Sequence, residues 1–248
     1  MAEILRTVEL TRHFGGITAV ARVSLSFEAN QLRSVIGSNG AGKTTLFNLL
    51  TGRLPATSGR VLFEGRDITN WPPHKIVRLG VCRTFQRSSV FFGLTVFENV
   101  RIAVQAKAGG SRRILASKAG LRGVNERAWG ILEQLGLTDQ AEAPARTLSH
   151  GDQRVLEVGI ALAGEPRILL LDEPTAGMSP AETERTTKLV RRLADEIAVV
   201  LVEHDMDVVM SISDRISVMH QGRIIAEGTP EEIRRNEEVR EAYLGRED

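Results

Sequence analysis

The chain has 248 residues, of which 42% are hydrophobic, which indicates a globular protein of one large or two small domains. Lys and Arg number 32 against 31 Asp and Glu, a formal net charge of +1, so no overall field favours nucleic acid or anionic lipid as a partner. A single cysteine, Cys82, excludes an intrachain disulfide. The N-terminus lacks the layout of a signal peptide, and every apolar run is far shorter than the roughly 20 residues that span a bilayer. A soluble or peripheral protein is expected.

Short apolar runs without alternation mark the predicted strands. They lie at residues 32–36, 168–171 and 198–202 and are rich in leucine and β-branched residues, a pattern typical of strands buried on both faces of a parallel sheet. Helical patterns lie between these runs, one of them beginning within residues 40–50. We therefore expect an α/β protein whose sheet is mostly parallel.

Two later helix starts carry clear local signals. At Ser179 the sequence S-P-A-E supplies an N-cap, a proline at the first helical position and Glu182 for a capping box. The same arrangement recurs at residues 229–232 and predicts a final polar helix, which follows a predicted hairpin turn at residues 221–222. This end of the chain is interpreted as an appendage.

Residues 101–127 differ from the rest of the chain in composition. Basic residues and glycines are frequent there, and Glu126 is the single acidic residue. A basic surface that faces anionic lipid headgroups is one interpretation. A solvated loop and helix face is the other, because isolated basic runs commonly have no partner.

A glycine-rich segment between the first apolar strand and a helical pattern matches the phosphate-binding loop G-x-x-x-x-G-K-[ST]. Its candidate nucleotide-binding residues are Gly37, Ser38, Asn39, Gly40, Ala41, Gly42, Lys43, Thr44 and the adjacent Thr45. Glycines let successive backbone N–H groups point inward, and the helix dipole adds positive potential, so a polyphosphate is the expected ligand. Lys43 is predicted to reach the outer phosphates and the Thr44 hydroxyl to ligate Mg²⁺. A purely structural glycine turn is the alternative.

The apolar run at 168–171 ends in two carboxylates, Asp172 and Glu173. The carboxyl ends of parallel strands form the edge at which such folds bind ligands. Asp172 is therefore the expected metal partner, and Glu173 is suited to polarise an attacking water as a general base. An ordinary boundary between a strand and a loop is the alternative, which the phosphate-binding loop disfavours.

Four further segments extend this pattern. Residues 148–153 read L-S-H-G-D-Q, about 20 residues before Asp172, Gln86 lies in R-T-F-Q, His204 in V-E-H-D and Phe14 in R-H-F-G-G. In this order and spacing they resemble the signature motif, Q-loop, switch histidine and adenine-stacking aromatic of ATP-binding-cassette proteins. Each alone would be unremarkable, with Ser149 a helix cap, Gln86 a surface residue, His204 a strand-end histidine and Phe14 a core aromatic.

The resemblance covers essentially the whole chain and implies a single domain of the P-loop NTPase (RecA-like) type with a helical insertion. The implied core spans about 4–86 and 164–228, the helical signature subdomain about 87–163, and a helical tail about 229–248. ATP and Mg²⁺ are the implied cofactors. The implied catalytic residues are Glu173, His204 and Gln86, and the implied metal ligands are Thr44, Gln86 and Asp172.

The resemblance further implies a head-to-tail dimer in which Ser149 and Gly151 of one subunit cover the ATP of the other. A serine hydroxyl, a glycine N–H and a helix start do form an anion site. Two departures from the family pattern are His150 and Asp152, which replace glycine and glutamine. Residues 176–179 read A-G-M-S where many members have S-A-L-D, so Ser179 stands where those members have the aspartate implied in communication across the dimer.

The branch of the family is indicated by longer phrases, among them F-Q-R-S-S-V-F-F-G-L-T-V-F-E-N-V and D-E-P-T-A-G-M-S-P. They resemble the ATPase subunits of bacterial importers for branched-chain amino acids and related solutes. The implied partners are transmembrane permease subunits, a second ATPase subunit, identical or related, and indirectly an external solute-binding protein, with no nucleic acid. The implied location is the cytoplasmic side of the inner membrane, as a peripheral subunit.

Four phenylalanines cluster near the Q-loop, namely Phe85, Phe91, Phe92 and Phe97. They suggest a groove for an amphipathic permease helix, with core packing as the alternative. The remaining alternatives for function are an ATPase of lipopolysaccharide export, a soluble cassette ATPase of DNA repair or translation, and a small-molecule phosphotransferase. The signature sequence disfavours the last, and the absence of heptads and cysteine clusters disfavours the soluble class.

Overall fold

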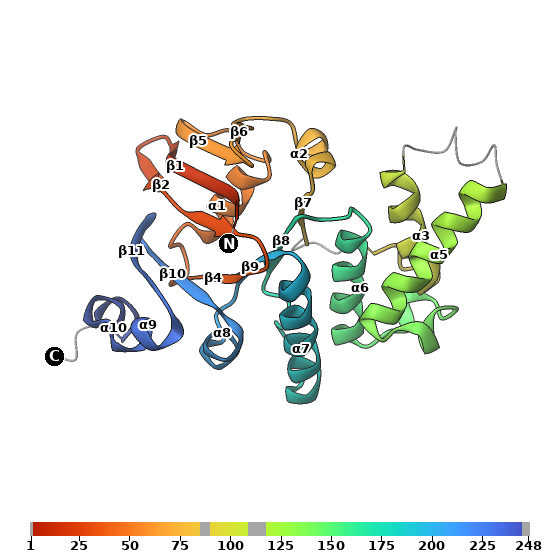
Figure 1. Cartoon of the computed structure of the whole chain (residues 1–248). Coiled ribbons are helices and arrows are strands. Elements are labelled where there is room, and N and C mark those ends of the chain that lie inside the picture. The colour runs from red at the N-terminus through yellow and green to blue at the C-terminus, as the bar shows by residue number, and fades with distance from the viewer. Residues whose placement is uncertain (1, 85–89, 109–117, 245–248) are drawn as a thin grey trace.

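The computed structural model describes residues 2–84, 90–108 and 118–244. Within them, a central six-stranded sheet has the order β11-β10-β4-β9-β8-β7 (Figure 1). In that order the strands are Arg223–Gly228, Arg215–His220, Leu32–Ile36, Ala198–Val202, Ile168–Asp172 and Val81–Arg83. Each neighbouring pair is parallel except β10 and β11. The predicted α/β class and mostly parallel sheet are confirmed.

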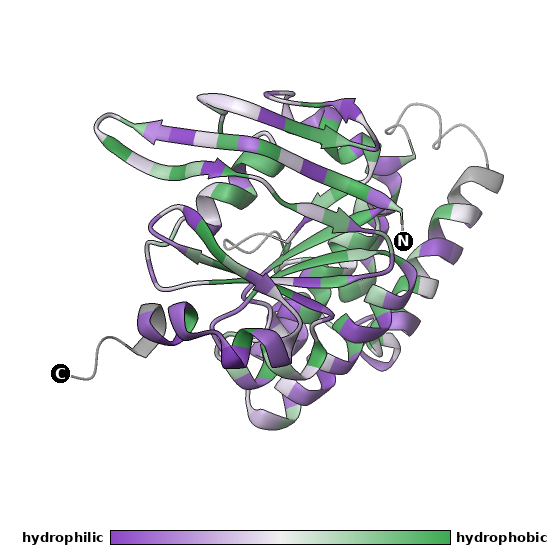
Figure 2. Cartoon of the chain, turned by 60° about the vertical axis from the view of Figure 1, so that its left-hand side comes forward, coloured by the Kyte–Doolittle hydropathy of each residue, from purple (hydrophilic) through white to green (hydrophobic). Residues whose placement is uncertain are grey.

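The predicted strands are buried on both faces. Every residue of β4, β8 and β9 is buried, and these strands appear as a hydrophobic centre in Figure 2. Along β8, Leu169 and Leu171 pack with helices α6 (His150–Leu162) and α7 (Pro180–Glu196). Ile168 and Leu170 point to the opposite face, toward α1 (Lys43–Leu50). Alternation of side chains along a strand thus supplies two cores at once.

A second, antiparallel sheet covers α1 on the side away from the central sheet (Figure 1). Its strand order is β2-β1-β5-β6, with β3 paired to β1. In chain order the strands are Glu3–Phe14, Ile17–Val23, Ser26–Glu28, Ser58–Phe63 and Arg66–Asp67. Phe27 and Phe63 of this sheet share one hydrophobic cluster with Phe47 of α1, so α1 is held between two sheets. No local pattern in the sequence predicted this layer.

Helices α3 (Val96–Lys107), α5 (Lys118–Leu135) and α6 pack against one another at the side of the molecule away from the antiparallel sheet (Figure 1). Short 3₁₀ turns at Thr138–Gln140 and Ala145–Thr147 connect α5 to α6. A Cβ atom at Gly159 of α6 would lie 2.4 Å from Leu135 Cδ1 of α5. The Leu135 side chain thus packs directly over the backbone of Gly159.

The remaining helices flank the central sheet. They are α2 (Pro73–Leu79), α8 (Met206–Ile212), α9 (Pro230–Arg235) and α10 (Glu237–Leu244). The predicted capping boxes form at Ser179 and Thr229, and the predicted hairpin turn joins β10 to β11, with positive φ at Gln221 and Gly222. In the part of the chain that is described, no helix is long and apolar enough to cross a membrane.

Replacing Leu169 by alanine is expected to lower the free energy of unfolding by about 2–5 kcal/mol, because the side chain is fully buried and its removal leaves a cavity. The exposed Ile17 at the β1–β2 hairpin provides the control, and Ile17→Ala should change stability by only about 0.5 kcal/mol. Urea denaturation of both variants measures the difference, and equal midpoints would contradict the assigned core.

Candidate nucleotide site

Three parallel strands carry the candidate site at their carboxyl ends. The phosphate-binding loop follows β4, Asp172 ends β8, and His204 follows β9. The ladder between β8 and β9 places Asp172 opposite Val202. The fold therefore brings together three segments that are far apart in the sequence.

The loop after β4 depends on glycine at two positions. A Cβ atom at Gly37 would lie 2.3 Å from the Met219 carbonyl oxygen, and one at Gly42 would lie 2.4 Å from that of Ala19. Gly40 and Gly42 also have φ of 80° and 107°, a region that side chains disfavour. Ser38, Asn39 and Gly40 are exposed, whereas Ala41 is buried. The loop thus presents open backbone at the start of α1, as a phosphate cradle requires.

Lys43 lies across this loop. Its Nζ atom donates hydrogen bonds to the carbonyl oxygens of Gly37 at 2.5 Å and Ser38 at 3.1 Å. Burial lowers the pKa of Lys43, while the nearby Glu173 and Asp172 carboxylates oppose that effect. The Lys43 ammonium group therefore interacts both with the loop carbonyls and with the carboxylates at the end of β8. The next residues, Thr44 and Thr45, are exposed and half-buried respectively.

Asp172 is held from one side only. Arg83 Nη2 donates to its Oδ2 atom at 2.7 Å, and the two side chains are only 6% and 1% exposed. Arg83 Nη1 donates to Asn48 Oδ1 of α1, also at 2.7 Å. Asp172 Oδ1 is buried and has no hydrogen-bond partner among the described residues. A buried, unpaired carboxylate oxygen calls for a partner, and the fit to a hard cation such as Mg²⁺ is good.

Glu173 and His204 face each other across the strand ends. His204 Nδ1 lies 3.9 Å from Glu173 Oε1, and their side chains are 64% and 41% exposed. Glu173 has a φ of 49°, and its N–H donates to the Val202 carbonyl at 2.8 Å. The backbone thus turns the Glu173 carboxylate out of the sheet into solvent, where it can meet a water molecule.

Glu203 supports this arrangement and was missed by the sequence analysis. Its buried carboxylate accepts hydrogen bonds from the Thr175 N–H at 2.9 Å and the Thr175 hydroxyl at 2.5 Å. It also accepts one from the His204 N–H at 3.2 Å. The carboxylate therefore ties the loop after Glu173 to the segment that carries His204. The V-E-H-D sequence contained this residue, but no local signal distinguished it.

The signature segment lies apart from the strand ends, at the start of α6. Ser149 caps the helix by accepting from the Asp152 N–H at 3.0 Å. Its hydroxyl lies 2.9 Å from Oε1 of Glu182 on α7. Hydrogen bonds from Ser179, Ser149 and the Gly151 N–H lower the pKa of Glu182 to about 2. The two donors predicted to bind a phosphate, Ser149 and Gly151, thus already contact an anionic side chain.

Asp152 and His150, the two departures from the family signature, both lie close to residues outside the signature segment. Asp152 is ion-paired with Arg185 of α7 and accepts a hydrogen bond from Gln140 Nε2 at 3.3 Å. His150 is exposed, and its ring lies beside Gly177 of the loop that precedes α7. Asp152 therefore fastens α6 to α7 where the family pattern has glutamine.

The predicted aromatic residues differ in their surroundings. Phe14 is 42% exposed at the end of β1, with the Arg12 guanidinium 4.6 Å from its ring centroid, so the ring is available for stacking. Phe91 and Phe92 are also exposed. Phe97 instead packs on Trp129, with ring centroids 5.0 Å apart, so core packing accounts for this member of the cluster. Two predicted residues, Phe85 and Gln86, lie outside the described residues.

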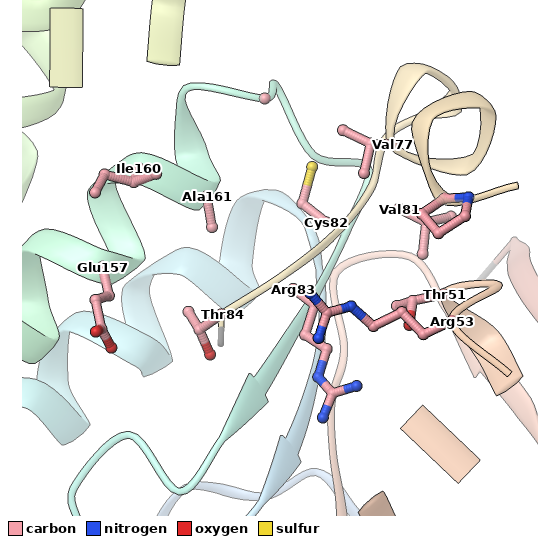
Figure 3. Close-up of a pocket in the computed structure, with 12 residues that line it drawn as sticks. Thr51, Arg53, Val77, Val81, Cys82, Arg83, Thr84, Glu157, Ile160 and Ala161 are labelled. Carbon is pink, nitrogen blue, oxygen red and sulfur yellow. The ribbon is translucent and has the colours of Figure 1, made fainter. Parts of the chain in front are cut away.

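A cavity of about 210 Å³ opens beside the edge strand β7. Figure 3 shows Val77 of α2 on one side of it, Glu157 and Ile160 of α6 on the other, and Arg83 and Thr84 between them. The lining is mostly apolar and includes the side chains of Val77, Val81 and Ile160.

Comparisons with known proteins agree with this geometry. The sequence model of the ABC transporter family matches residues 20–176, and that of the branched-chain amino acid ATP-binding cassette transporter family matches residues 223–248. The high-affinity branched-chain amino acid transport ATP-binding protein BraF of Pseudomonas aeruginosa is 45% identical, over 98% of each chain.

Two solved structures extend the likeness to the fold. A nucleotide-free ATP-binding cassette from an ABC transporter is 34% identical, with a TM-score of 0.86 over 98% of this chain and 100% of the other. A dimeric post-hydrolysis cassette bound to ADP and Pi is 25% identical, with a TM-score of 0.77 over 92% and 99%. This chain therefore belongs to the ABC transporter family, as one of its ATP-binding cassettes.

Proposed function

We propose that this chain is the ATP-hydrolysing subunit of an importer for branched-chain amino acids or related small solutes. The match of residues 223–248 to the branched-chain amino acid cassette family carries this assignment, because it lies outside the region that ABC cassettes of all kinds share. The near full-length identity to BraF supports it. The chain would lie peripherally on the cytoplasmic side of the inner membrane.

At the strand ends, nucleotide binding is assigned to residues 37–45, with Phe14 beneath the adenine. When bound, Mg²⁺ would offset the negative charge of the phosphate oxygens. Thr44, Asp172 and Gln86 are the proposed ligands, and the unpaired Asp172 Oδ1 supports this role. Lys43 would exchange its two carbonyl contacts for phosphate oxygens, which form stronger, charge-assisted hydrogen bonds.

Glu173 is the proposed general base, with His204 and Gln86 beside the γ-phosphate. The exposed Glu173 carboxylate can accept a proton from an attacking water. His204, 3.9 Å away, would hold the γ-phosphate and the carboxylate in register. Glu203 holds the loop after Glu173 through Thr175 and holds His204 through its backbone N–H.

The second half of the site would come from another cassette. Ser149 and Gly151 present a hydroxyl and an N–H at a helix start, which suits a γ-phosphate. In this proposal a RecA-like core (4–86 and 164–228) binds ATP, a helical subdomain (87–163) presents the signature to the partner, and residues 229–248 form a tail. The 25% identical dimeric cassette supports such a pairing.

Permease subunits are the proposed membrane partners, and an external solute-binding protein would deliver the cargo. The mostly apolar cavity between α2, β7 and α6 and the exposed Phe91 and Phe92 suit an amphipathic permease helix. Closure of the cassette dimer would then move the docked helices.

The assignment as an importer motor predicts the composition of the native complex. Purification of the tagged chain from its own membrane, in mild detergent with ATP and Mg²⁺, should recover permease subunits and a second cassette. Mass spectrometry identifies them, and Lys43→Ala, which is expected to weaken nucleotide binding, reports whether recovery depends on ATP. Soluble repair or translation factors without a permease would contradict the transport role.

The base assignment predicts that Glu173→Gln keeps ATP binding but lowers the hydrolysis rate by about 10²–10⁴-fold, because the amide cannot accept the proton. The variant should accumulate as an ATP-bound dimer. Phosphate release and sedimentation measure the two effects. Glu165→Gln, at an exposed turn, is the control and should hydrolyse normally. A normal rate in Glu173→Gln would remove Glu173 from this role.

A further inference from the structure

Arg83 lies between the cavity beside β7 and the carboxylate of Asp172. With Thr84 it lines that cavity (Figure 3). Its guanidinium donates to Asp172 Oδ2 and to Asn48 Oδ1, each at 2.7 Å. The Thr84 hydroxyl accepts a hydrogen bond from the Asp172 N–H at 3.3 Å. Arg83, the last residue of β7, therefore holds the side chain of Asp172, and the next residue, Thr84, holds its backbone.

The two-point contact restricts the rotation of the carboxylate. A planar guanidinium held by Asn48 and by Asp172 has little freedom to turn, and the ring of Phe47 lies 5.2 Å from its centre. With Oδ2 fixed in this way, Oδ1 is the oxygen left without a hydrogen-bond partner among the described residues. Arg83 thus determines which oxygen of Asp172 remains available.

We propose that Arg83 is a positioning residue for the metal site: it holds Asp172 Oδ2 so that Oδ1 faces the cation. This role rests on the proposed assignment of Asp172 as a metal ligand. Replacing a group that orients a metal ligand commonly lowers metal affinity by about 10–100-fold. Lysine in this position has the charge but cannot make both contacts in one plane.

The test measures the affinity of the ADP-bound chain for Mn²⁺ by electron paramagnetic resonance. Arg83→Met is expected to weaken Mn²⁺ binding by about tenfold or more. Arg33→Met is the matched control, because Arg33 is equally buried in the same sheet but is paired with Glu227. The Arg33→Met variant should have a lower free energy of unfolding and an unchanged affinity for Mn²⁺. Unchanged Mn²⁺ affinity in Arg83→Met would overturn the positioning role.

A second variant covers the case in which Arg83→Met does not fold. Asn48→Ala keeps the ion pair but releases the other end of the guanidinium, so a smaller loss of Mn²⁺ affinity in the same direction is expected. An Asn48→Ala affinity equal to that of the wild type would then overturn the positioning role. Failure of the wild-type chain to bind Mn²⁺ with ADP would instead overturn the metal site of the proposed function.

Glu182 carries an independent inference at the signature segment. Its Oε1 atom accepts from the Ser149 hydroxyl at 2.9 Å, and a Cβ atom at Gly151 would lie 2.5 Å from the same oxygen. Its Oε2 atom belongs to the capping box of α7, accepting from the Ser179 N–H at 3.0 Å. One carboxylate oxygen is thus structural, and the other accepts from the Ser149 hydroxyl and lies beside Gly151, the two residues assigned to the partner's ATP.

We infer that the Glu182 carboxylate occupies the anion-binding position of the signature segment and must be displaced when the γ-phosphate of the partner's ATP arrives. This step rests on the proposed cassette dimer. A carboxylate and a phosphate compete for the same hydroxyl and N–H, and they repel each other if both are present. Glu182 would therefore raise the ATP concentration needed to close the dimer.

Glu182→Gln separates the two roles, because glutamine also completes a capping box but carries no charge. In a Glu173→Gln background, the ATP concentration for half-maximal dimer, measured by sedimentation, is expected to fall by up to about tenfold, the effect of one charge-assisted hydrogen bond. Glu232→Gln is the matched control, since Glu232 forms the same capping box with Thr229. It should leave the midpoint unchanged.

An unchanged or higher midpoint in Glu182→Gln would overturn the competition. Equal shifts in Glu182→Gln and Glu232→Gln would also overturn it, because the effect would then belong to capping alone. Absence of any ATP-dependent dimer in the parent Glu173→Gln chain would instead contradict the dimer of the proposed function.

Discussion

Hydrogen bonds between parallel strands set the positions of the groups at the nucleotide site. Strand β8 pairs with β9 up to Asp172 and Val202, and β4 pairs with β9 on the other side. Because parallel strands all end at the same edge, the sheet itself places the loop after β4 near the carboxylates at the end of β8. The two sides of the sheet are covered by α1 and by α6 and α7, so this edge is what remains open to a ligand.

Groups assigned to ATP already have partners within the free chain. Lys43 donates to the carbonyls of its own loop, and Ser149 to Glu182. In the proposed function, ATP binding exchanges these internal hydrogen bonds for bonds to phosphate oxygens. The net binding free energy is then the difference between the two sets of hydrogen bonds. Asp172 Oδ1 differs from these groups, because it is buried and has no hydrogen-bond partner among the described residues.

The elements predicted from the sequence are those whose signals lie within a short stretch of residues. Apolar runs predicted β4, β8 and β9, and the capping sequences predicted the starts of α7 and α9. The antiparallel sheet was missed. Its first strand, β1, is interrupted by positive φ at Glu9 and by register shifts toward β2 and β5, so no long stretch alternates regularly. Strand pairs of this kind depend on distant segments, which a local pattern does not reveal.

The same limit explains which site residues were missed. Lys43, Asp172 and Glu173 lie in motifs whose chemistry can be read locally, whereas Arg83 matters through Asn48 and Asp172, which are 35 and 89 residues away. Glu182 was recognised only as a capping residue, since its contact with Ser149 spans 33 residues. Arg83 connects Asp172 at the end of β8 to Asn48 of α1, and Glu182 of α7 contacts Ser149 of the signature segment. The motifs thus identify the groups proposed to meet ATP, and the long-range contacts hold those groups in place.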